Sequence, residues 1–379
     1  MSDASLFPAI GVSRLVLTDF RGWNSLQLEA GMAPVVLTGP NGSGKTNLLE
    51  ALSFLAPGRG LRRARLQDVT RSGHAMGMQG GWGIAATVHT ADGPVDLGTG
   101  RDPGTSDRRV VRINGINARS QTELGDIVSI VWLTPAMDRL FTESPSGRRR
   151  FLDRLVFGLY PGHVGHLSAY EKALRQRTGL LRDNVNDPAW IALLENTMAS
   201  HGVAIAAARQ DIITRLNRAL SRVAPPFPRP DLGLNGWLES LLEDHPATDV
   251  EDLFRQHMCQ NRHRESAGMP AEGPHRTDLM VHNHSNDQPA ARCSTGEQKA
   301  LLLSILLAQA RIQGAQRGTA PLLLLDEVAA HLDAQRREAL YEALIALGAQ
   351  AWLTGTDRAL FEPFGNRAQF FDVSDGQLH

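Results

Sequence analysis

The segment GPNGSGKT, residues 39–46, restricts the possible folds more than any other part of the sequence. It follows the pattern G-x-x-x-x-G-K-[S/T] and lies between a short apolar run, residues 34–38, and an amphipathic segment that starts at Lys45. A strand, a glycine-rich turn and a helix in this order form a phosphate-binding loop, whose backbone N–H groups surround phosphate oxygens. The sequence therefore predicts a nucleotide site at the start of an α/β domain, and a plain glycine turn is the weaker alternative.

The residue types in this loop suit ATP and Mg²⁺. Lys45 is expected to place a positive charge on the β- and γ-phosphates, which makes it a candidate catalytic residue, and the Thr46 hydroxyl is expected to coordinate Mg²⁺. The other expected nucleotide contacts are Gly39, Pro40, Asn41, Gly42, Ser43, Gly44 and Asn47.

The second half of such a site is a carboxylate at the end of a buried strand. The run LLLLDE, residues 322–327, supplies Asp326 as a ligand of Mg²⁺ and Glu327 as the general base that activates the attacking water. A strand that ends at a solvated acidic turn is the alternative for this run alone. Beside a phosphate-binding loop we favour the catalytic interpretation.

The segment STGEQ, residues 294–298, begins a long apolar helix with a polar tip. Ser294 as a capping residue and the open backbone at Gly296 present free N–H groups at the positive end of the helix dipole, which favours an anion. The simpler alternative is a capping box of Ser294 with Glu297. Because residues 39–46 already bind one phosphate group, we expect this second phosphate site to take the nucleotide of another copy of the chain.

Composition narrows the class of protein. The 379 residues are 42% hydrophobic and carry 39 Lys+Arg against 40 Asp+Glu, so contact with a nucleic acid has to come from local patches. Cys259 and Cys293 form no CxxC pair, and the spacing of the histidines His263, His275, His282 and His284 is irregular; neither pattern indicates a metal cage. Residues 1–11 do not resemble a secretory signal and apolar runs are too short for a membrane span, so we expect a cytoplasmic protein with no membrane partner.

The hydrophobic pattern predicts three segments. Residues 1–134 combine the strand, loop and helix of the nucleotide site with strand patterns at 13–30 and at 82–133, which we interpret as antiparallel. Residues 135–268 are dominated by helical spacing and are expected to form an inserted helical domain. Residues 269–379 return to α/β character.

Taken together, the order and spacing of these motifs resemble ABC-type ATPase heads, and further blocks are similar to the RecF family. Those blocks are TGPNGSGKTNLLEAL, SGRRRFLDRL, YEKALRQRTGLL, GPHRTDL and STGEQKALLLSILLAQA. The resemblance spans nearly the whole chain. It implies an α/β fold: an ABC-type P-loop ATPase head with an antiparallel β subdomain and an inserted α-helical arm domain.

The resemblance also implies a mechanism and partners. Two copies would dimerise on ATP, with Ser294 and Gly296 of one copy on the γ-phosphate bound by the other, and with Asp333 at the interface; a helix-capping Asp is the alternative for Asp333. The family further implies DNA as a partner, both as duplex and at single-strand/double-strand junctions. It implies cooperation with RecR and RecO, recombinase loading that involves RecA indirectly, and a weak, DNA-stimulated ATPase. An ATPase subunit coupled to another partner, such as a transporter, is the alternative.

Several features depart from ABC heads or stay open. No switch histidine follows the last core strand, where Thr356 and Asp357 stand instead, and residues 135–138 are only a candidate Q-loop. Arg21 resembles a nucleotide-contacting residue of related heads, with a surface arginine as the alternative. The arginine clusters at 62–65 and 108–112 are DNA candidates, although solvated charge is the commoner role of such runs. The cluster at 148–150 is interpreted as structural.

Overall fold

The computed structural model describes residues 6–8, 10–71, 80–102, 108–185, 187–374 and 376–379. The chain divides into two compact units. The first, which we call the head, comprises residues 1–138, 224–227 and 294–379, and the second, which we call the arm, comprises residues 139–223 and 228–293. Across the described residues, none of the helices is both long enough and apolar enough to cross a membrane.

An antiparallel sheet forms one part of the head, in the order β2-β1-β4-β5-β6-β7. Its strands are β1 (Gly11–Phe20), β2 (Trp23–Glu29), β4 (Trp82–Thr90), β5 (Gly93–Arg101), β6 (Arg109–Ile113) and β7 (Ile116–Asn117). The β6–β7 hairpin turns at Asn114 and Gly115, with φ of 50° and 79°. Positive φ at both turn residues is the geometry that an Asn-Gly pair favours.

A second sheet, in the order β15-β14-β3-β13-β12-β8, forms the other part of the head. Its strands are β3 (Val35–Thr38), β8 (Ile130–Leu133), β12 (Leu322–Leu325), β13 (Ala351–Thr354), β14 (Gln369–Ser374) and β15 (Gln377–Leu378). All pairings are parallel except that of β14 with β15. Every residue of β3, β12 and β13 is buried, as expected for central parallel strands covered on both faces.

One prediction for this region was wrong. Residues 130–133, expected to continue the antiparallel strands of 82–133, form β8, which pairs in parallel with β12. The short helix α2 (Leu124–Ile127) separates β8 from β7 along the chain, and β8 lies in the other sheet. A short apolar run fixes a strand but not its partner or its direction, because both kinds of pairing present the same side-chain alternation.

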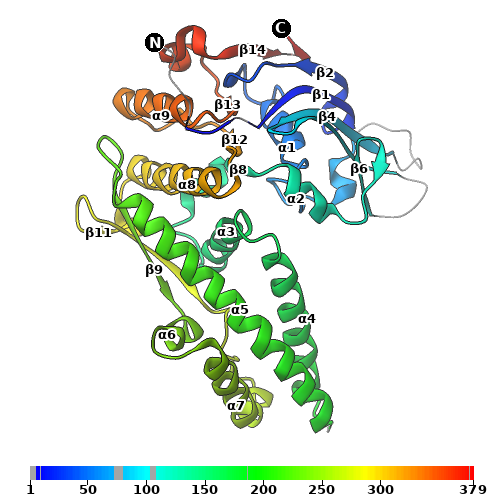
Figure 1. The fold of residues 1–379 in the computed structure, drawn as a ribbon, viewed down its shortest axis with the longest axis vertical. Helices are drawn as coiled ribbons and strands as arrows, with labels where there is room; N and C mark the ends of the chain where they lie inside the picture. The colour runs from blue at the N-terminus through cyan, green and yellow to red at the C-terminus, as the bar shows by residue number, and fades with distance from the viewer. Residues whose placement is uncertain (1–5, 9, 72–79, 103–107, 186, 375) are drawn as a thin grey trace. The chain divides into compact units, whose positions relative to one another are not determined.

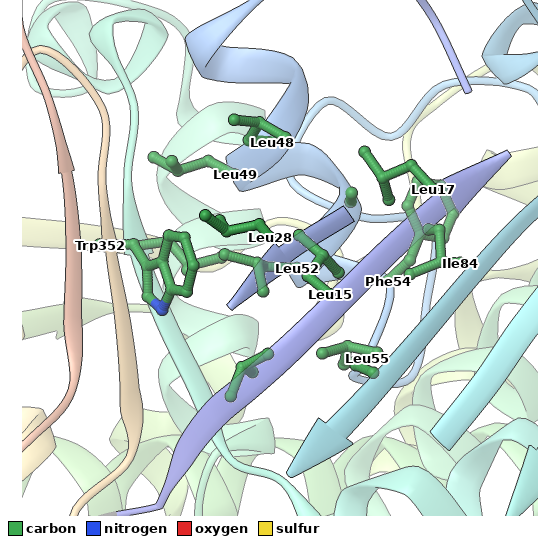
Figure 2. Close-up of a cluster of buried hydrophobic side chains, with 14 of the residues drawn as sticks. Leu15, Leu17, Leu28, Leu48, Leu49, Leu52, Phe54, Leu55, Ile84 and Trp352 are labelled. Carbon is green, nitrogen blue, oxygen red and sulfur yellow. The ribbon is translucent and has the colours of Figure 1, made fainter. Parts of the chain in front are cut away.

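The core of the head joins the two sheets through helix α1 (Lys45–Ser53). Figure 2 shows Leu48, Leu49 and Leu52 of α1 lying with Leu28 of the antiparallel sheet and Trp352 of β13. The helix that carries Lys45 and Thr46 is therefore held by apolar contacts from both sheets. Two further helices belong to the head, α8 (Thr295–Arg317) and α9 (Ala334–Leu347) (Figure 1).

The arm consists mainly of helices. They are α3 (Pro145–Phe157), α4 (His163–Arg182), α5 (Pro188–Leu220), α6 (Trp237–Asp244) and α7 (Ala247–Ser266). In Figure 1, α4 and α5 lie side by side, and their shared core with α7 includes Tyr170, Met198 and Phe254. Residues 230–235, expected to be part of a proline-rich interruption, form strand β9 (Pro230–Asn235).

The C-terminal bound of the arm differs from the expected residue 268. Strand β10 (Asp278–Asn283) pairs with β9 over six residues and with β11 (Gln288–Pro289), so the segment up to Cys293 belongs to the arm. Arg148 of α3 fixes the same segment, because its Nε and Nη2 each donate to a carboxylate oxygen of Asp278 at 2.8 Å. Arg148 is therefore structural, as interpreted from the sequence. The change from a helical to a strand-like sequence pattern near residue 268 therefore lies inside the arm and does not mark its boundary.

Candidate nucleotide site

The phosphate-binding loop connects β3 to α1, and a side chain would clash or be strained at two of its glycines. Gly39 has φ of 141°, and a Cβ atom there would lie 2.1 Å from the Val373 carbonyl oxygen. Gly44 caps α1 in the left-handed region, at φ of 107°, and a Cβ atom there would lie 3.1–3.2 Å from the Trp23 ring. Only glycine allows the loop to turn this tightly against β14 and the β1–β2 hairpin.

Lys45 lies at the first position of α1, with a largely buried side chain. Its Nζ donates to the carbonyl oxygens of Gly39 and Pro40, both at 2.7 Å, so the ammonium group lies across the mouth of its own loop. Burial lowers the pKa of Lys45, and the nearby carboxylates of Glu327 and Asp326 oppose that effect. An ammonium group held by two neutral carbonyls is free to exchange them for phosphate oxygens, which carry charge.

Asp326, at the end of β12, is the most heavily engaged carboxylate of the site. Its Oδ1 accepts hydrogen bonds from Thr46 Oγ1 at 3.0 Å and from Thr354 Oγ1 at 2.7 Å, and the residue is 3% exposed. Burial raises the pKa of the Asp326 carboxyl, while the two hydroxyl hydrogen bonds lower it in part. Strands β3, β13 and β12 are neighbours and run parallel, so the loop, Thr354 and Asp326 meet at one edge of the sheet.

Thr46 and Asp326 fit Mg²⁺ on the evidence of this geometry. Hydroxyl and carboxylate oxygens are ligands that Mg²⁺ prefers, and neighbouring ligands at about 2.1 Å from an octahedral ion lie about 3 Å apart. Thr46 Oγ1 and Asp326 Oδ1 lie 3.0 Å apart. The raised pKa of Asp326 is also what a buried carboxylate shows when its positive partner is a bound ion rather than a side chain.

Glu327 follows in a conformation that few non-glycine residues adopt, with φ of 49°. Its backbone N–H donates to Thr354 Oγ1 at 2.8 Å, and its carbonyl oxygen accepts a hydrogen bond from Lys299 Nζ at 2.8 Å. The residue is partly exposed, unlike Asp326. The backbone of the expected general base is thus held on both sides by side chains that sequence reasoning did not assign to the site.

A cavity of about 330 Å³ opens beside the loop. Its lining residues are Gly22, Trp23, Pro40, Asn41, Gly42, Ser43, Gly44, Asn47 and Gly376. Six of these were predicted as nucleotide contacts, and Gly22, Trp23 and Gly376 were not. Ser43 Oγ and Trp23 Nε1 are buried without a hydrogen-bond partner in the described chain. Segment 294–298 contributes nothing to this lining.

The tip of α8 forms the capping box predicted as its simpler interpretation. Ser294 Oγ accepts from the Glu297 N–H at 3.3 Å, and the Ser294 N–H donates to Glu297 Oε2 at 2.8 Å. Ser294 and Thr295 are exposed and Gly296 is partly exposed, so the tip remains accessible. The capping box is confirmed, and a contact of Ser294 and Gly296 with phosphate stays a prediction.

Asp333 and the sensor candidates occupy helix starts. Asp333 is the N-cap of α9, where its Oδ1 accepts from the Arg336 N–H at 2.8 Å, in agreement with the alternative given for it. Asp357 likewise accepts from the Ala359 N–H at 2.9 Å, and Thr356 is exposed. Thr354, two residues before Thr356, is the residue that reaches Asp326 and Glu327.

The arginine candidates separate into engaged and exposed residues. Arg21 donates to both carboxylate oxygens of the buried Glu50, at 2.9 and 2.7 Å, and Arg62 adds bonds to Glu50 and to Asn47. Arg109 is directed inward: its guanidinium donates to the carbonyl oxygens of Phe54, Ala56 and Gly58, just after α1. Arg109 is therefore corrected from a DNA candidate to a structural residue, because the carbonyls that follow a helix end need a donor.

The histidine side chains do not come together to form a metal site in the described ranges. Within the described ranges, no group of three or more His, Cys, Asp or Glu side chains is placed to hold a metal ion. His275, for example, forms a hydrogen bond with Tyr170 through Nδ1 at 2.8 Å, and burial lowers its pKa to about 4.

Comparison with known proteins agrees with this geometry. A family model described as the RecF/RecN/SMC N terminal domain matches residues 11–376. A curated relative from Rhizobium etli, named DNA replication and repair protein RecF, is 49% identical over 374 residues, which cover 97% of this chain and 98% of the relative. The chain belongs to the RecF family.

Solved structures show the same fold. A RecF structure, described as the recombination mediator protein RecF-ATPrS in the RecFOR pathway, superposes with a TM-score of 0.84 at 21% identity and covers 98% of both chains. An Smc head domain from Pyrococcus furiosus has a TM-score of 0.55 at 17% identity, covering 97% of this chain and 95% of the other. The predicted fold class, an ABC-type P-loop head with an antiparallel subdomain, is confirmed for this RecF-family chain.

Proposed function

We propose that this RecF-family chain is an ATP-gated DNA clamp. Two copies, each with MgATP at residues 39–47, associate around both nucleotides and hold duplex or gapped DNA. Slow hydrolysis of ATP then separates the copies and releases the DNA. The observation that carries the proposal is the Thr46–Asp326 contact of 3.0 Å, which brings the two expected Mg²⁺ ligands together beside the phosphate-binding loop.

Within that site the chain's residues have separate tasks. Backbone N–H groups of residues 39–46 bind the phosphates, and Lys45 moves from the carbonyls of Gly39 and Pro40 to the β- and γ-phosphates. Thr46 and Asp326 would hold Mg²⁺, which would supply positive charge against the phosphates. The Glu327 carboxylate orients the attacking water and accepts its proton as the bond from the water oxygen to the γ-phosphorus forms. The bond from the γ-phosphorus to the bridging oxygen breaks in the same step, so that ADP leaves with the electron pair and inorganic phosphate is the other product.

The second copy is needed for the exposed tip of α8. Ser294 and Gly296 do not line the cavity beside their own loop, whereas an accessible helix start at the positive end of the helix dipole suits a phosphate. Placed on the γ-phosphate of the opposite copy, this tip makes dimerisation depend on ATP. Symmetry then gives two identical composite sites, with Asp333 at the interface between copies.

DNA and protein partners follow from the family. The named relative acts in DNA replication and repair, and the solved RecF structure is assigned to the RecFOR pathway. We propose that the ATP-bound dimer recognises gapped DNA and, with RecR and RecO, promotes loading of the recombinase RecA. The net charge of −1 requires DNA contacts to come from local arginines such as the exposed Arg63 and Arg65 rather than from overall charge.

The test is the salt dependence of binding to a gapped duplex, measured with and without ATP. The affinity should be higher with ATP, and the slope of log K against log salt should be steeper, because a closed dimer releases more counterions. Lys45→Met should remove the effect of ATP, whereas Lys172→Met, at an exposed lysine of α4, should behave like the wild type. Equal affinities and slopes with and without ATP would contradict a nucleotide-gated clamp.

A further inference from the structure

Lys299 is a buried lysine that sits between the tip of α8 and the catalytic end of β12. Its side chain is 1% exposed, and its Nζ donates to the Glu327 carbonyl oxygen at 2.8 Å. The second partner is Asp138, whose Oδ2 lies 3.6 Å from the same Nζ. Lys299 follows Ser294 by five residues, so it lies little more than one helical turn from the tip.

A buried ammonium group needs a compensating role, because lysines are almost never fully buried unless paired. Burial lowers the pKa of Lys299, and Asp138 is the main group that opposes this shift, with Glu327 and Asp326 adding smaller effects. The other oxygen of Asp138, Oδ1, is buried with no hydrogen-bond partner in the described chain. In the described chain, the Asp138 carboxylate therefore interacts with Lys299 rather than with a wider network of side chains.

The bond to Glu327 acts on a strained residue. A non-glycine residue at φ of 49° persists only when its surroundings fix it. Here Thr354 accepts the Glu327 N–H and Lys299 donates to the Glu327 carbonyl, so both peptide groups are fixed by side chains. One of these side chains belongs to β13 and the other to α8.

A second contact joins the same two segments. A Cβ atom at Gly296 would lie 3.1 Å from the carbonyl oxygen of His331, so the tip of α8 packs closely against the chain that follows Glu327. His331 also has positive φ, at 64°. The stretch from Glu327 to His331 is thus held in its backbone conformation next to the tip and the first turn of α8.

We propose that Lys299 is a positioning residue that ties the orientation of Glu327 to the position of the α8 tip, with Asp138 holding its ammonium group in place. This inference rests on the proposed function, in which the tip binds the partner copy's nucleotide and Glu327 is the base. Phosphate bound at Ser294 and Gly296 then fixes the position of α8. The Lys299 hydrogen bond transmits that position to the Glu327 peptide group. Hydrolysis becomes dependent on engagement of the second copy.

The competing role for Lys299 is neutralisation of the carboxylates of Asp326, Glu327 and Asp138. Under that role, loss of the lysine charge would leave three acidic groups near the phosphates and would weaken nucleotide binding. Under the positioning role, nucleotide binding stays and the hydrolysis step suffers. Dissociation constants and single-turnover rates therefore separate the two.

The experiment compares the full-length variants Lys299→Met, Asp138→Asn and Lys172→Met in ATP binding, thermal unfolding and single-turnover hydrolysis. We expect Lys299→Met to bind ATP within about threefold of the wild type and to hydrolyse it roughly 10- to 100-fold more slowly, the scale of a small misplacement of a catalytic group. Asp138→Asn should show a smaller loss in the same direction. Lys172→Met should match the wild type.

A double variant tests whether Lys299 acts through Glu327. Lys299→Met combined with Glu327→Gln should hydrolyse ATP no more slowly than Glu327→Gln alone. Once Glu327→Gln has removed the base, the loss of Lys299 has no carboxylate left to misplace. Independent effects, which multiply, would overturn the inference. So would a wild-type rate in Lys299→Met, or weakened ATP binding that accounts for its whole defect.

The outcomes separate the inference from the proposed function. A wild-type rate in Lys299→Met, with a large loss in Glu327→Gln, removes the role of Lys299 and leaves the clamp intact. An unchanged hydrolysis rate in Glu327→Gln overturns both the inference about Lys299 and the role of Glu327 as the base in the proposed function. If Lys299→Met does not fold, Asp138→Asn decides: a wild-type rate in that variant overturns the inference.

Discussion

Thr354 and Asp326 are joined by a hydrogen bond of 2.7 Å from Thr354 Oγ1 to Asp326 Oδ1, at the edge of the parallel sheet where the phosphate-binding loop begins. The same hydroxyl accepts the Glu327 N–H at 2.8 Å. A single buried side chain of β13 therefore orients both acidic residues of the site. ABC heads often carry a histidine near this point, and this chain places a fully buried threonine at the end of the strand.

Replacement of Thr354 by valine should impair both stability and catalysis. The change keeps the side-chain shape but leaves the partly buried Glu327 N–H without its acceptor, which costs about 1 kcal/mol. Asp326 also loses one of its two hydroxyl donors, so a higher Mg²⁺ concentration should be required for ATP hydrolysis. Thermal unfolding and a Mg²⁺ titration of the hydrolysis rate measure the two effects.

The matched control is Thr356→Val, at the exposed threonine two residues later. Its unfolding free energy should stay within about 0.5 kcal/mol of the wild type, the usual range for surface substitutions. If Thr354→Val and Thr356→Val had the same stability and the same Mg²⁺ requirement, Thr354 would have no special role in the site.

The second prediction concerns pH and the carboxylate of Asp326. Its pKa is raised in the folded protein above the ordinary value of 3.8, chiefly by burial. In the pH range just above 3.8, the folded state therefore holds the proton more tightly than the unfolded state, and stability falls as pH rises through that range. The nucleotide-free protein therefore carries this cost on the alkaline side of that range.

Asp326→Asn should accordingly stabilise the nucleotide-free protein at pH 7, while it removes the stabilisation that MgATP gives. The amide keeps an oxygen for the hydroxyls of Thr46 and Thr354, so the packing is preserved. The advantage over wild type should shrink as pH falls towards 3.8 and should be absent below that value, where the wild-type carboxyl is protonated in both states. A variant less stable than wild type at pH 7 would show that the buried charge is not the dominant effect.

The third prediction concerns Arg109, which holds the end of the helix that carries Lys45 and Thr46. Arg109→Met leaves the carbonyls of Phe54, Ala56 and Gly58 without their donor, with an expected loss on the order of 2–4 kcal/mol of unfolding free energy. Denaturant unfolding measures the loss. DNA affinity of the folded fraction should be unchanged.

Arg112→Met provides the comparison, since Arg112 lies on the same strand and is exposed. Its unfolding free energy should be nearly that of the wild type. A DNA defect in Arg109→Met at full stability would return Arg109 to the set of DNA contacts.

The sequence predicts the parts of the site that depend on local chemistry. The phosphate-binding loop needs glycines at fixed positions, and LLLLDE needs a buried strand before its carboxylates, so both could be located from residue order alone. The structure brings these two segments together: Thr46 and Asp326, 280 residues apart, share a hydrogen bond. The capping box of Ser294 and Glu297 is equally local, and it is present.

The residues that were missed act across elements. Thr354 is an ordinary β-strand residue in the sequence, and only the pairing of β13 with β12 brings it to Asp326. Lys299 is one of three lysines in the sequence, but its partners depend on how α8 lies against β12. Strand β10 was assigned to the wrong unit for the same reason, because its pairing with β9 joins segments about 50 residues apart.

The most direct test of the account is the molar mass of Glu327→Gln in solution, measured by light scattering over a range of concentrations with saturating MgATP. The proposed clamp predicts that this variant, which binds ATP without hydrolysing it, reaches twice the monomer mass of 41.3 kDa. Addition of Ser294→Arg should return it to the monomer mass with ATP still bound. A Glu327→Gln protein that stays monomeric at every concentration with ATP bound would contradict the shared nucleotide on which the account depends.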